Sequence, residues 1–161
     1  MADENMSERF LHSLGGAAYF EAIGAQVVEA VPGRSTMRLP YAPHLVGNPD
    51  TGVVHGGVIT GLLDHACGMA VGSALGALSS TAGGMRGIAT LDLRIDYLKA
   101  AKPGADITVI AECVKITRQI VFARGRAFQA SEDDLIASAT GTFIITELRS
   151  GGIITEPRAG S

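Results

Sequence analysis

The sequence lacks tryptophan, has only two cysteines among its 161 residues, and is poor in charge, with 18% Asp, Glu, Lys and Arg. Cys67 and Cys113 lie in apolar segments and form no C-x-x-C pair or Cys/His spacing, so we interpret them as reduced thiols of the core. The low charge and the 47% hydrophobic content exclude a disordered chain, and the missing G-X-Y period excludes collagen.

Basic clusters are also missing. The net charge is −3, and no block of Lys or Arg exceeds isolated residues. Nucleic acid requires a basic stripe that neutralises phosphates, and an anionic membrane surface requires a polybasic segment. We therefore expect neither nucleic acid nor a membrane as partner. The acidic start of the chain shows no basic region ahead of an apolar run, so no signal peptide is expected and a cytoplasmic location is predicted.

A chain of this length corresponds to one domain, which can bury roughly 70% of its unfolded surface without a disulfide or a metal. Three segments are predicted within it. Residues 1–24 form an N-terminal helical segment, residues 25–147 form the main domain, and residues 148–161, which have no periodicity, form a flexible tail.

Hydrophobic periodicity predicts a β-hairpin, a loop up to His55, one long helix and four long strands. The predicted elements are strands Gln26–Val31 and Ser35–Leu39, helix Gly57–Leu78, and strands Ile88–Lys99, Asp106–Ile116, Ile120–Gln129 and Leu135–Thr146. Short turns between the strands predict an antiparallel meander. The order favours an α+β fold in which a curved antiparallel sheet wraps one long central helix.

The first long strand alternates, which assigns Leu91 and Tyr97 to its core face and Thr90 and Asp92 to its solvent face. The long helix, Gly57–Leu78, would span about 33 Å, the length of a membrane span. However, an Asp beside a His near its middle is costly in lipid, so we favour a helix enclosed by protein.

Several catalytic motifs are absent, namely the G-x-S-x-G elbow, the P-loop, H-E-x-x-H and a G-x-G-x-x-G between a strand and a helix. No pair of histidines has the i, i+4 spacing of a helical metal site, so we expect no metal. What remains is the passage from Gly47 to Asp64, whose two glycines, Gly56 and Gly57, lie where the helix begins. Unpaired N–H groups at a helix N-terminus can stabilise an oxyanion such as that of thioester hydrolysis, although a plain loop-to-helix turn has the same pattern.

Asp64 is a carboxylate in a helix otherwise built for burial. Burial without a partner favours proton uptake and would make it a base or a nucleophile near neutral pH. The alternative is an Asp bonded to a neighbouring backbone group or to His65. Seven residues separate Gly57 from Asp64, about 10 Å along a helix, so the two cannot touch one carbonyl carbon. If both are catalytic, two copies of the chain must meet about a two-fold axis.

The motif Val54-His55-Gly56-Gly57-Val58-Ile59-x-x-Leu62-Leu63-Asp64-x-Ala66 is followed by Thr90-Leu91-Asp92-Leu93-x-Ile95-x-Tyr97-Leu98 and by Ala139-Thr140-Gly141-Thr142-Phe143. Together these segments resemble the hotdog-fold acyl-CoA thioesterases of the phenylacetate-degradation (PaaI-like) type. The likeness covers roughly residues 24–146. It implies a hotdog domain, an acyl-CoA substrate, no cofactor, and a homodimer, often paired into a tetramer, with active sites at the subunit interface.

The resemblance also implies roles for single residues. Asp64 would be the catalytic general base or nucleophile, Gly57 would supply the oxyanion N–H, and His55 would orient or polarise the thioester carbonyl. Asn48 would position the water or the carboxylate, although it stands seven residues before His55 where the family pattern has six. Thr90 would hold the water. Four basic residues are candidates for the phosphates of coenzyme A: Arg86, Arg118, Arg124 and Arg126.

Three alternatives remain beside the thioesterase. A non-catalytic acyl-CoA or acyl-carrier binding module would have the same fold and no turnover. A hotdog dehydratase or hydratase needs a different placement of His and carboxylate, which we do not find. Cys67 lies three residues after Asp64, but without a placed His base it is better explained as core packing than as a nucleophile.

Overall fold

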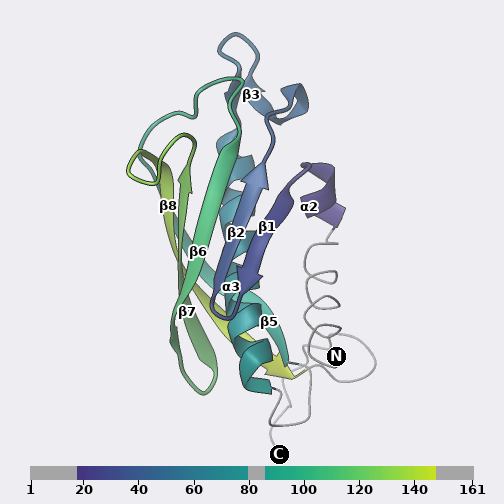
Figure 1. Ribbon diagram of the computed structural model, residues 1–161, viewed down its shortest axis with the longest axis vertical. Helices are drawn as coiled ribbons and strands as arrows, with labels where there is room; N and C mark the ends of the chain where they lie inside the picture. Colours follow the sequence, from purple (N-terminus) through teal and green to yellow (C-terminus); the bar gives the residue numbers. More distant parts are fainter. Residues whose placement is uncertain (1–17, 80–85, 148–161) are drawn as a thin grey trace, which may run out of the picture.

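A long apolar helix, α3 (Gly56–Ser79), forms the centre of the fold, and a curved sheet wraps one side of it (Figure 1). The computed structural model describes residues 18–79 and 86–147. Leu62, Leu63, Ala66 and Met69 of α3 are fully buried because the helix packs against β2, β5, β6 and β7. The stretch with the length and hydropathy of a membrane span is therefore a core helix covered by protein, as predicted.

The sheet is antiparallel and has six strands in the order β1-β2-β6-β7-β8-β5. Its strands are β1 (Gln26–Val31), β2 (Arg34–Leu39), β5 (Arg86–Tyr97), β6 (Ile107–Ile116), β7 (Ile120–Phe128) and β8 (Leu135–Glu147). These bounds differ from the predicted ones by two residues at most, and the central helix with its curved sheet confirms the predicted hotdog architecture.

One feature of the predicted meander is wrong. β6, β7 and β8 are consecutive neighbours, but β5 pairs with β8 and not with β6. The edge of β6 that a meander would give to β5 is taken by β2, whose residues 34–39 pair with residues 107–112. As a result β5, with 12 residues, lies at the edge of the sheet.

The predicted loop before α3 contains regular structure of its own. A 3-10 turn, η1 (Pro43–Leu45), leads into a small hairpin of β3 (Val46–Asn48) and β4 (Val53–Val54). This hairpin lies at one end of the long axis of the molecule (Figure 1). The backbone N–H of His55 donates to the carbonyl of Leu45 at 2.8 Å, so the hairpin fixes the entry of the chain into α3.

Of the predicted N-terminal helical segment, the structure describes α2 (Ala18–Ala22). Its Phe20 is buried and stacks on the ring of His65, with centroids 4.3 Å apart, and its Tyr19 ring lies over Gly61. α2 therefore covers part of α3 that the sheet leaves open. Three parts of the chain lie outside the described residues. They are residues 1–17 of the predicted helical segment, residues 80–85 between α3 and β5, and residues 148–161, the predicted flexible tail.

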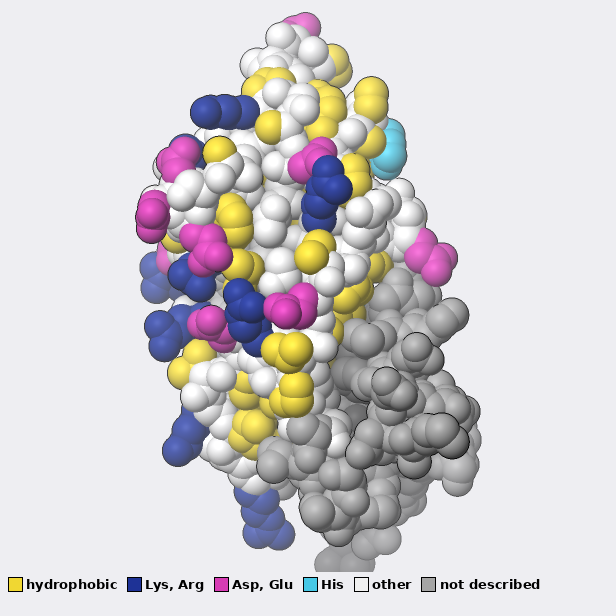
Figure 2. Space-filling model, viewed as in Figure 1, with side chains coloured by type: hydrophobic (Ala, Val, Ile, Leu, Met, Phe, Trp, Pro, Cys, Tyr) yellow, Lys and Arg dark blue, Asp and Glu magenta, His cyan; other side chains and the backbone are white. Residues whose placement is uncertain are grey.

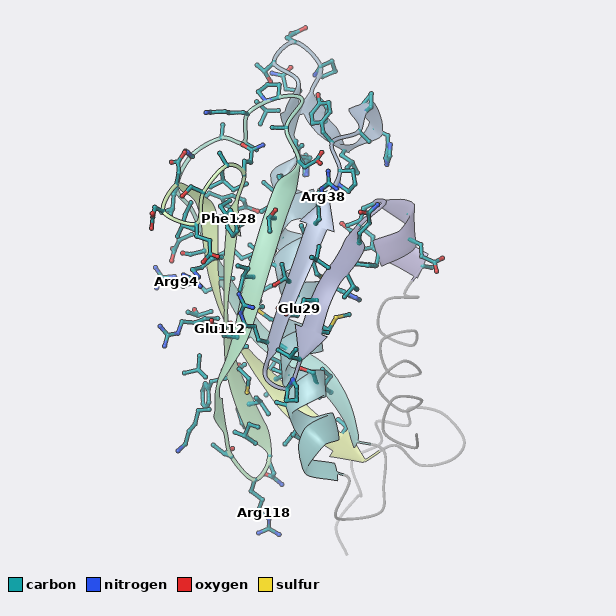
Figure 3. All side chains as sticks on the ribbon, viewed as in Figure 1. Glu29, Arg38, Arg94, Glu112, Arg118 and Phe128 are labelled. Carbon is teal, nitrogen blue, oxygen red and sulfur yellow. The ribbon has the colours of Figure 1, made fainter. Side chains whose placement is uncertain are left out.

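The outer face of the sheet carries charges of both signs (Figure 2). Many of them are paired across strands, as in Arg126 with Glu112 and Glu132 at 3.9 and 3.5 Å, and Arg34 with Glu29 at 2.9 Å. Arg94 and Glu112 point outward from the sheet (Figure 3). Cys67 is buried, Cys113 is half-buried, and both are free thiols.

Candidate active site

The start of α3 is built around His55. Nδ1 of its imidazole accepts the backbone N–H of Gly57 at 2.9 Å, and its carbonyl accepts the N–H of Val58 at 3.0 Å. His55 therefore caps the helix as Ser or Asp usually does, with a side-chain acceptor for a free N–H of the first turn. We expected an unpaired N–H at Gly57, and the structure shows instead that a side chain of the same motif accepts it.

This hydrogen bond has a consequence for the imidazole. Because Nδ1 acts as the acceptor, the neutral ring carries its proton on Nε2. Nε2–H is then the donor that His55 presents outward, and the side chain is exposed. The helix terminus therefore carries the Gly57 N–H, which is paired with the imidazole, and the Nε2–H of the same imidazole, with the positive end of the helix dipole behind them.

Glycine is needed around His55 for steric reasons. A Cβ on Gly57 would lie 2.9 Å from Nδ1 of His55, and a Cβ on Gly47 would lie 3.0 Å from its Cα. Gly56 has a different neighbour, since its Cβ would lie 3.3 Å from the hydroxyl oxygen of Tyr97. Close packing on both sides therefore explains the small residues of the His-Gly-Gly motif.

Asp64 lies two turns further along α3 and is partly buried. The hydroxyl of Thr90 donates to Oδ1 of Asp64 at 2.9 Å. Of the two alternatives drawn from the sequence, burial without a partner is therefore wrong, because the carboxylate is only partly buried and has Thr90 as a hydrogen-bond partner. Thr90 thus holds one of the two carboxylate oxygens, Oδ1.

A β-bulge turns Thr90 toward Asp64. Thr90 pairs with Phe143 of β8 and Asp92 with Thr142, so Leu91 is an extra residue in β5. The bulge places Thr90 on the same side of the strand as Leu93 and turns Leu91 outward, where 55% of it is exposed. Simple alternation had assigned Thr90 to the solvent face and Leu91 to the core, and the structure corrects both assignments.

The structure keeps the remaining predicted residues apart. The carboxamide oxygen of Asn48 accepts the N–H of Asp50 at 2.9 Å, which places this side chain in the β3–β4 turn and not against Asp64. Gly57 and Asp64 are themselves separated by two helical turns, about 10 Å along the axis. Within one chain, these two candidate groups therefore do not meet.

The four candidate arginines are not brought together either. Arg124 and Arg126 alternate with the buried Ala123, Gly125 and Ala127, so both point away from α3. Arg118 lies at the tip of the β6–β7 turn, at the opposite end of the molecule from β3 (Figure 3). The side chain of Arg86 lies outside the described part of the chain. Within that part, no three His, Cys, Asp or Glu side chains gather as metal ligands would.

Two hydroxyl groups at this site, those of Tyr97 and Thr60, were not predicted from the sequence. Tyr97 donates to the carbonyl of Gly56 at 2.6 Å, and its oxygen lies 2.5 Å from Oγ1 of Thr60. Tyr97 had been assigned to the apolar face of its strand, yet 51% of it is exposed. One sequence signal for Tyr97 is its position at the end of the strand that also carries Thr90, the partner of Asp64.

Comparisons with known proteins identify the family of the chain. A family model described as the thioesterase superfamily matches residues 51–136. A protein of Halobacterium salinarum is 35% identical over 95 residues, which are 58% of this chain and 58% of the relative, so the match spans less than two thirds of that protein. A protein of Salmonella typhimurium named as the medium/long-chain acyl-CoA thioesterase YigI is 34% identical over 110 residues, 64% of this chain and 69% of the relative.

A crystal structure of a Pseudomonas aeruginosa protein superposes with a TM-score of 0.70 at 38% identity and covers 85% of this chain and 96% of that one. The family model covers more than half of this chain and includes the start of α3, Asp64 and Thr90. On these grounds the chain belongs to the thioesterase superfamily.

Proposed function

We propose that this protein is an acyl-CoA thioesterase, which hydrolyses a thioester to a free acid and CoA. The observation that carries the proposal is the Asp64–Thr90 pair. A hydroxyl on β5 donates to a carboxylate on the long helix α3 of a thioesterase-superfamily fold. The name of the Salmonella relative supports acyl-CoA as the substrate class. The narrower assignment to the phenylacetate-degradation type rests on the motif residues.

In the proposed reaction, Asp64 either takes a proton from an attacking water or attacks the thioester carbonyl carbon itself. The carbonyl oxygen becomes negative as the new C–O bond forms, and the Gly57 N–H at the positive end of α3 stabilises it. The intermediate then collapses, the C–S bond breaks, and CoA leaves as a thiolate. With water as the attacking group this step gives the free acid directly, whereas with Asp64 as the nucleophile it gives an acyl–Asp64 anhydride, which water then hydrolyses to the free acid and the regenerated carboxylate. A thiol with a pKa of about 8.5 is a good leaving group, so no strong general acid is required.

His55 takes part in this step. Its Nδ1 holds the Gly57 N–H in the free chain, so a substrate oxygen that binds there displaces the imidazole from that N–H. The Gly57 N–H then exchanges one acceptor for another, so this donor of the first helical turn is not left unpaired. We assign to His55 the role of orienting the carbonyl, and to Asn48 the role of holding the loop that carries His55.

Two copies of the chain complete the site in this proposal. The edge strand β5 leaves a row of backbone groups unpaired, and Leu91, Tyr97 and Leu98 are 55%, 51% and 57% exposed. Exposed edges invite pairing with another strand. A two-fold axis beside β5 would bring Asp64 of one subunit to the Gly57 N–H of the other.

We further propose that two such dimers assemble into a tetramer, for which the exposed Val114 and Phe122 of the outer face offer an apolar contact. The phosphates of coenzyme A would be bound by Arg86, Arg118, Arg124 or Arg126 across subunits, since one chain does not gather these residues. The free thiols and the absence of basic clusters support a cytoplasmic enzyme without nucleic-acid or membrane partners.

The test is release of free CoA from short-chain, long-chain and aryl acyl-CoA thioesters by wild type and by Asp64→Asn. We expect turnover that falls at least about 100-fold in the variant, because it loses a base or a nucleophile. Asp92→Asn is the matched control, since Asp92 lies on the same strand as Thr90 but pairs with Thr142 on the other face. Binding of acyl-CoA without turnover on the whole panel would contradict the proposal and favour the binding module.

A further inference from the structure

We propose that Tyr97 is a positioning residue for the oxyanion donor of this site. The inference rests on the proposed function, because it concerns the N–H group that would bind the thioester oxygen. Tyr97 does not contact that N–H. Its hydroxyl donates to the carbonyl of Gly56 at 2.6 Å, and this carbonyl and the Gly57 N–H are the two ends of one peptide unit.

The Gly56 carbonyl accepts more hydrogen bonds than an ordinary helical carbonyl. Besides the N–H four residues ahead that an α-helix supplies, the hydroxyls of Tyr97 and Thr60 lie 2.6 and 3.2 Å away. The two hydroxyl oxygens are also 2.5 Å apart. Each hydroxyl has one proton, so the shorter distances correspond to a chain in which Thr60 donates to Tyr97 and Tyr97 donates to Gly56.

Such a chain acts on the N–H in two ways. First, a planar peptide whose carbonyl is held by a side chain of a neighbouring strand cannot rotate freely, so the direction of the Gly57 N–H is fixed. Second, hydrogen bonds to a carbonyl polarise the amide and strengthen its N–H as a donor, by about 10–30% for each bond. Both effects favour a negative oxygen over the neutral carbonyl of the ground state.

The geometry also connects the two halves of the site through one strand. Thr90 and Tyr97 both lie on β5, where Thr90 holds the carboxylate of Asp64 and Tyr97 holds the peptide before Gly57. Gly56 permits this approach, since any larger residue would press on the Tyr97 hydroxyl at 3.3 Å. The edge strand thus sets the position of α3 at both catalytic groups.

The experiment compares Tyr97→Phe with Tyr41→Phe in the full chain. The Tyr41 hydroxyl also donates to a glycine carbonyl, that of Gly52 at 2.9 Å, but this carbonyl lies in the β3–β4 turn and not at the helix terminus. Each variant therefore removes one hydrogen bond of the same kind. The readouts are kcat and KM for acyl-CoA hydrolysis and the amide resonance of Gly57 in the ¹H–¹⁵N spectrum.

For Tyr97→Phe we expect kcat to fall about three- to tenfold with KM nearly unchanged, since only the transition state develops full charge at the donor. The Gly57 amide proton should move upfield in this variant and stay in place in Tyr41→Phe. Thr60→Val, which removes the second hydroxyl, should change both readouts in the same direction by less, and it replaces Tyr97→Phe if that variant does not fold.

A kcat within twofold of wild type, an equal loss in Tyr41→Phe, or an unmoved Gly57 resonance would overturn the role of Tyr97. Failure of the proposed function gives a different result, in which wild type itself hydrolyses no thioester. The amide resonance then decides alone whether Tyr97 acts on the Gly57 peptide.

Discussion

Thr90 contributes to the orientation of Asp64, because its hydroxyl donates to one of the two carboxylate oxygens. A hydrogen bond to a charged group contributes about 1.5–3 kcal/mol. We therefore predict that Thr90→Val lowers kcat about tenfold or more, whereas Thr90→Ser, which keeps the hydroxyl, stays close to wild type. Steady-state hydrolysis of the best acyl-CoA substrate measures both. Equal activity of the valine and serine variants would show that the hydroxyl has no part in catalysis.

Cys67 is a potential nucleophile whose surroundings keep its thiol protonated. Burial, together with the negative charge of Asp64, raises the pKa of the Cys67 thiol to about 12. Since the thiolate is the reactive form, we predict that iodoacetamide at pH 8 leaves Cys67 unmodified in the native protein and spares hydrolysis.

Peptide mapping after labelling measures this, with urea-unfolded protein as the positive control. Cys113 serves as the internal comparison for labelling. It is half-buried, and burial raises the pKa of its thiol as well. Rapid labelling of native Cys67 with loss of activity would reinstate it as a nucleophile.

Among the contacts between elements, Asp106, just before β6, holds β2 and the loop that follows it. Its carboxylate accepts the backbone N–H of Tyr41 at 2.8 Å and the guanidinium of Arg38 on β2, with Nε at 2.9 Å. The Tyr41 N–H, followed by the Arg38 side chain, lowers the pKa of Asp106 below its ordinary value. A carboxyl group with a lowered folded pKa stabilises the protein above the unfolded pKa and loses that contribution as the pH falls through the folded value.

We therefore predict that Asp106→Asn lowers the free energy of unfolding at pH 7 by about 1 kcal/mol or less, since solvent screens this exposed pair. The difference from wild type should shrink as the pH falls below about 4. Urea unfolding at several pH values measures it. Asp96→Asn is the control, because Asp96 pairs with Arg94 of its own strand and joins no second element. A loss for Asp106→Asn that does not change with pH would contradict this account.

The sequence predicted the elements well because each is long and strongly periodic. The prediction was wrong where contacts between distant segments determine the structure. Alternation cannot reveal that Leu91 is an extra residue in β5, and so it turned Thr90 away from Asp64. The length of a turn cannot show that β2 occupies the edge of β6, and so β5 was given the wrong neighbour.

The same difference between local sequence pattern and tertiary contact applies to the candidate site. Asp64 and Gly57 were predictable because a carboxylate in an apolar helix and paired glycines at its start are unusual. The capping of Gly57 by His55 was not, since it depends on a side-chain rotamer. Tyr97 was missed because a tyrosine in an alternating strand fits the apolar pattern, and only the fold brings its hydroxyl to Gly56.

The whole molecule presents a long exposed edge at the strand that holds both halves of the site. Thr90 and Tyr97 lie on β5, and Leu91 and Leu98 beside them face solvent. A monomer with this edge leaves backbone groups unpaired and apolar side chains exposed, and it also leaves Asp64 and the Gly57 N–H about 10 Å apart. A two-fold contact at β5 would resolve both, so we predict a site shared between two subunits.

Subunit complementation tests that claim most directly. Asp64→Asn removes the proposed base or nucleophile. Gly57→Pro removes the N–H and, because a Cβ at this position would lie 2.9 Å from Nδ1 of His55, also displaces that imidazole, so each variant alone should be inactive. In a mixed dimer, one of the two sites would combine the intact Asp64 of one subunit with the intact Gly57 of the other.

The measurement is acyl-CoA hydrolysis after the two inactive variants are unfolded together and refolded at equal concentration. With random pairing, half of the dimers are mixed and each has one intact site, so we predict recovery of about a quarter of the wild-type activity. Variants refolded separately and then assayed together without exchange should stay inactive. A co-refolded mixture that forms dimers and remains inactive would contradict a site shared between subunits.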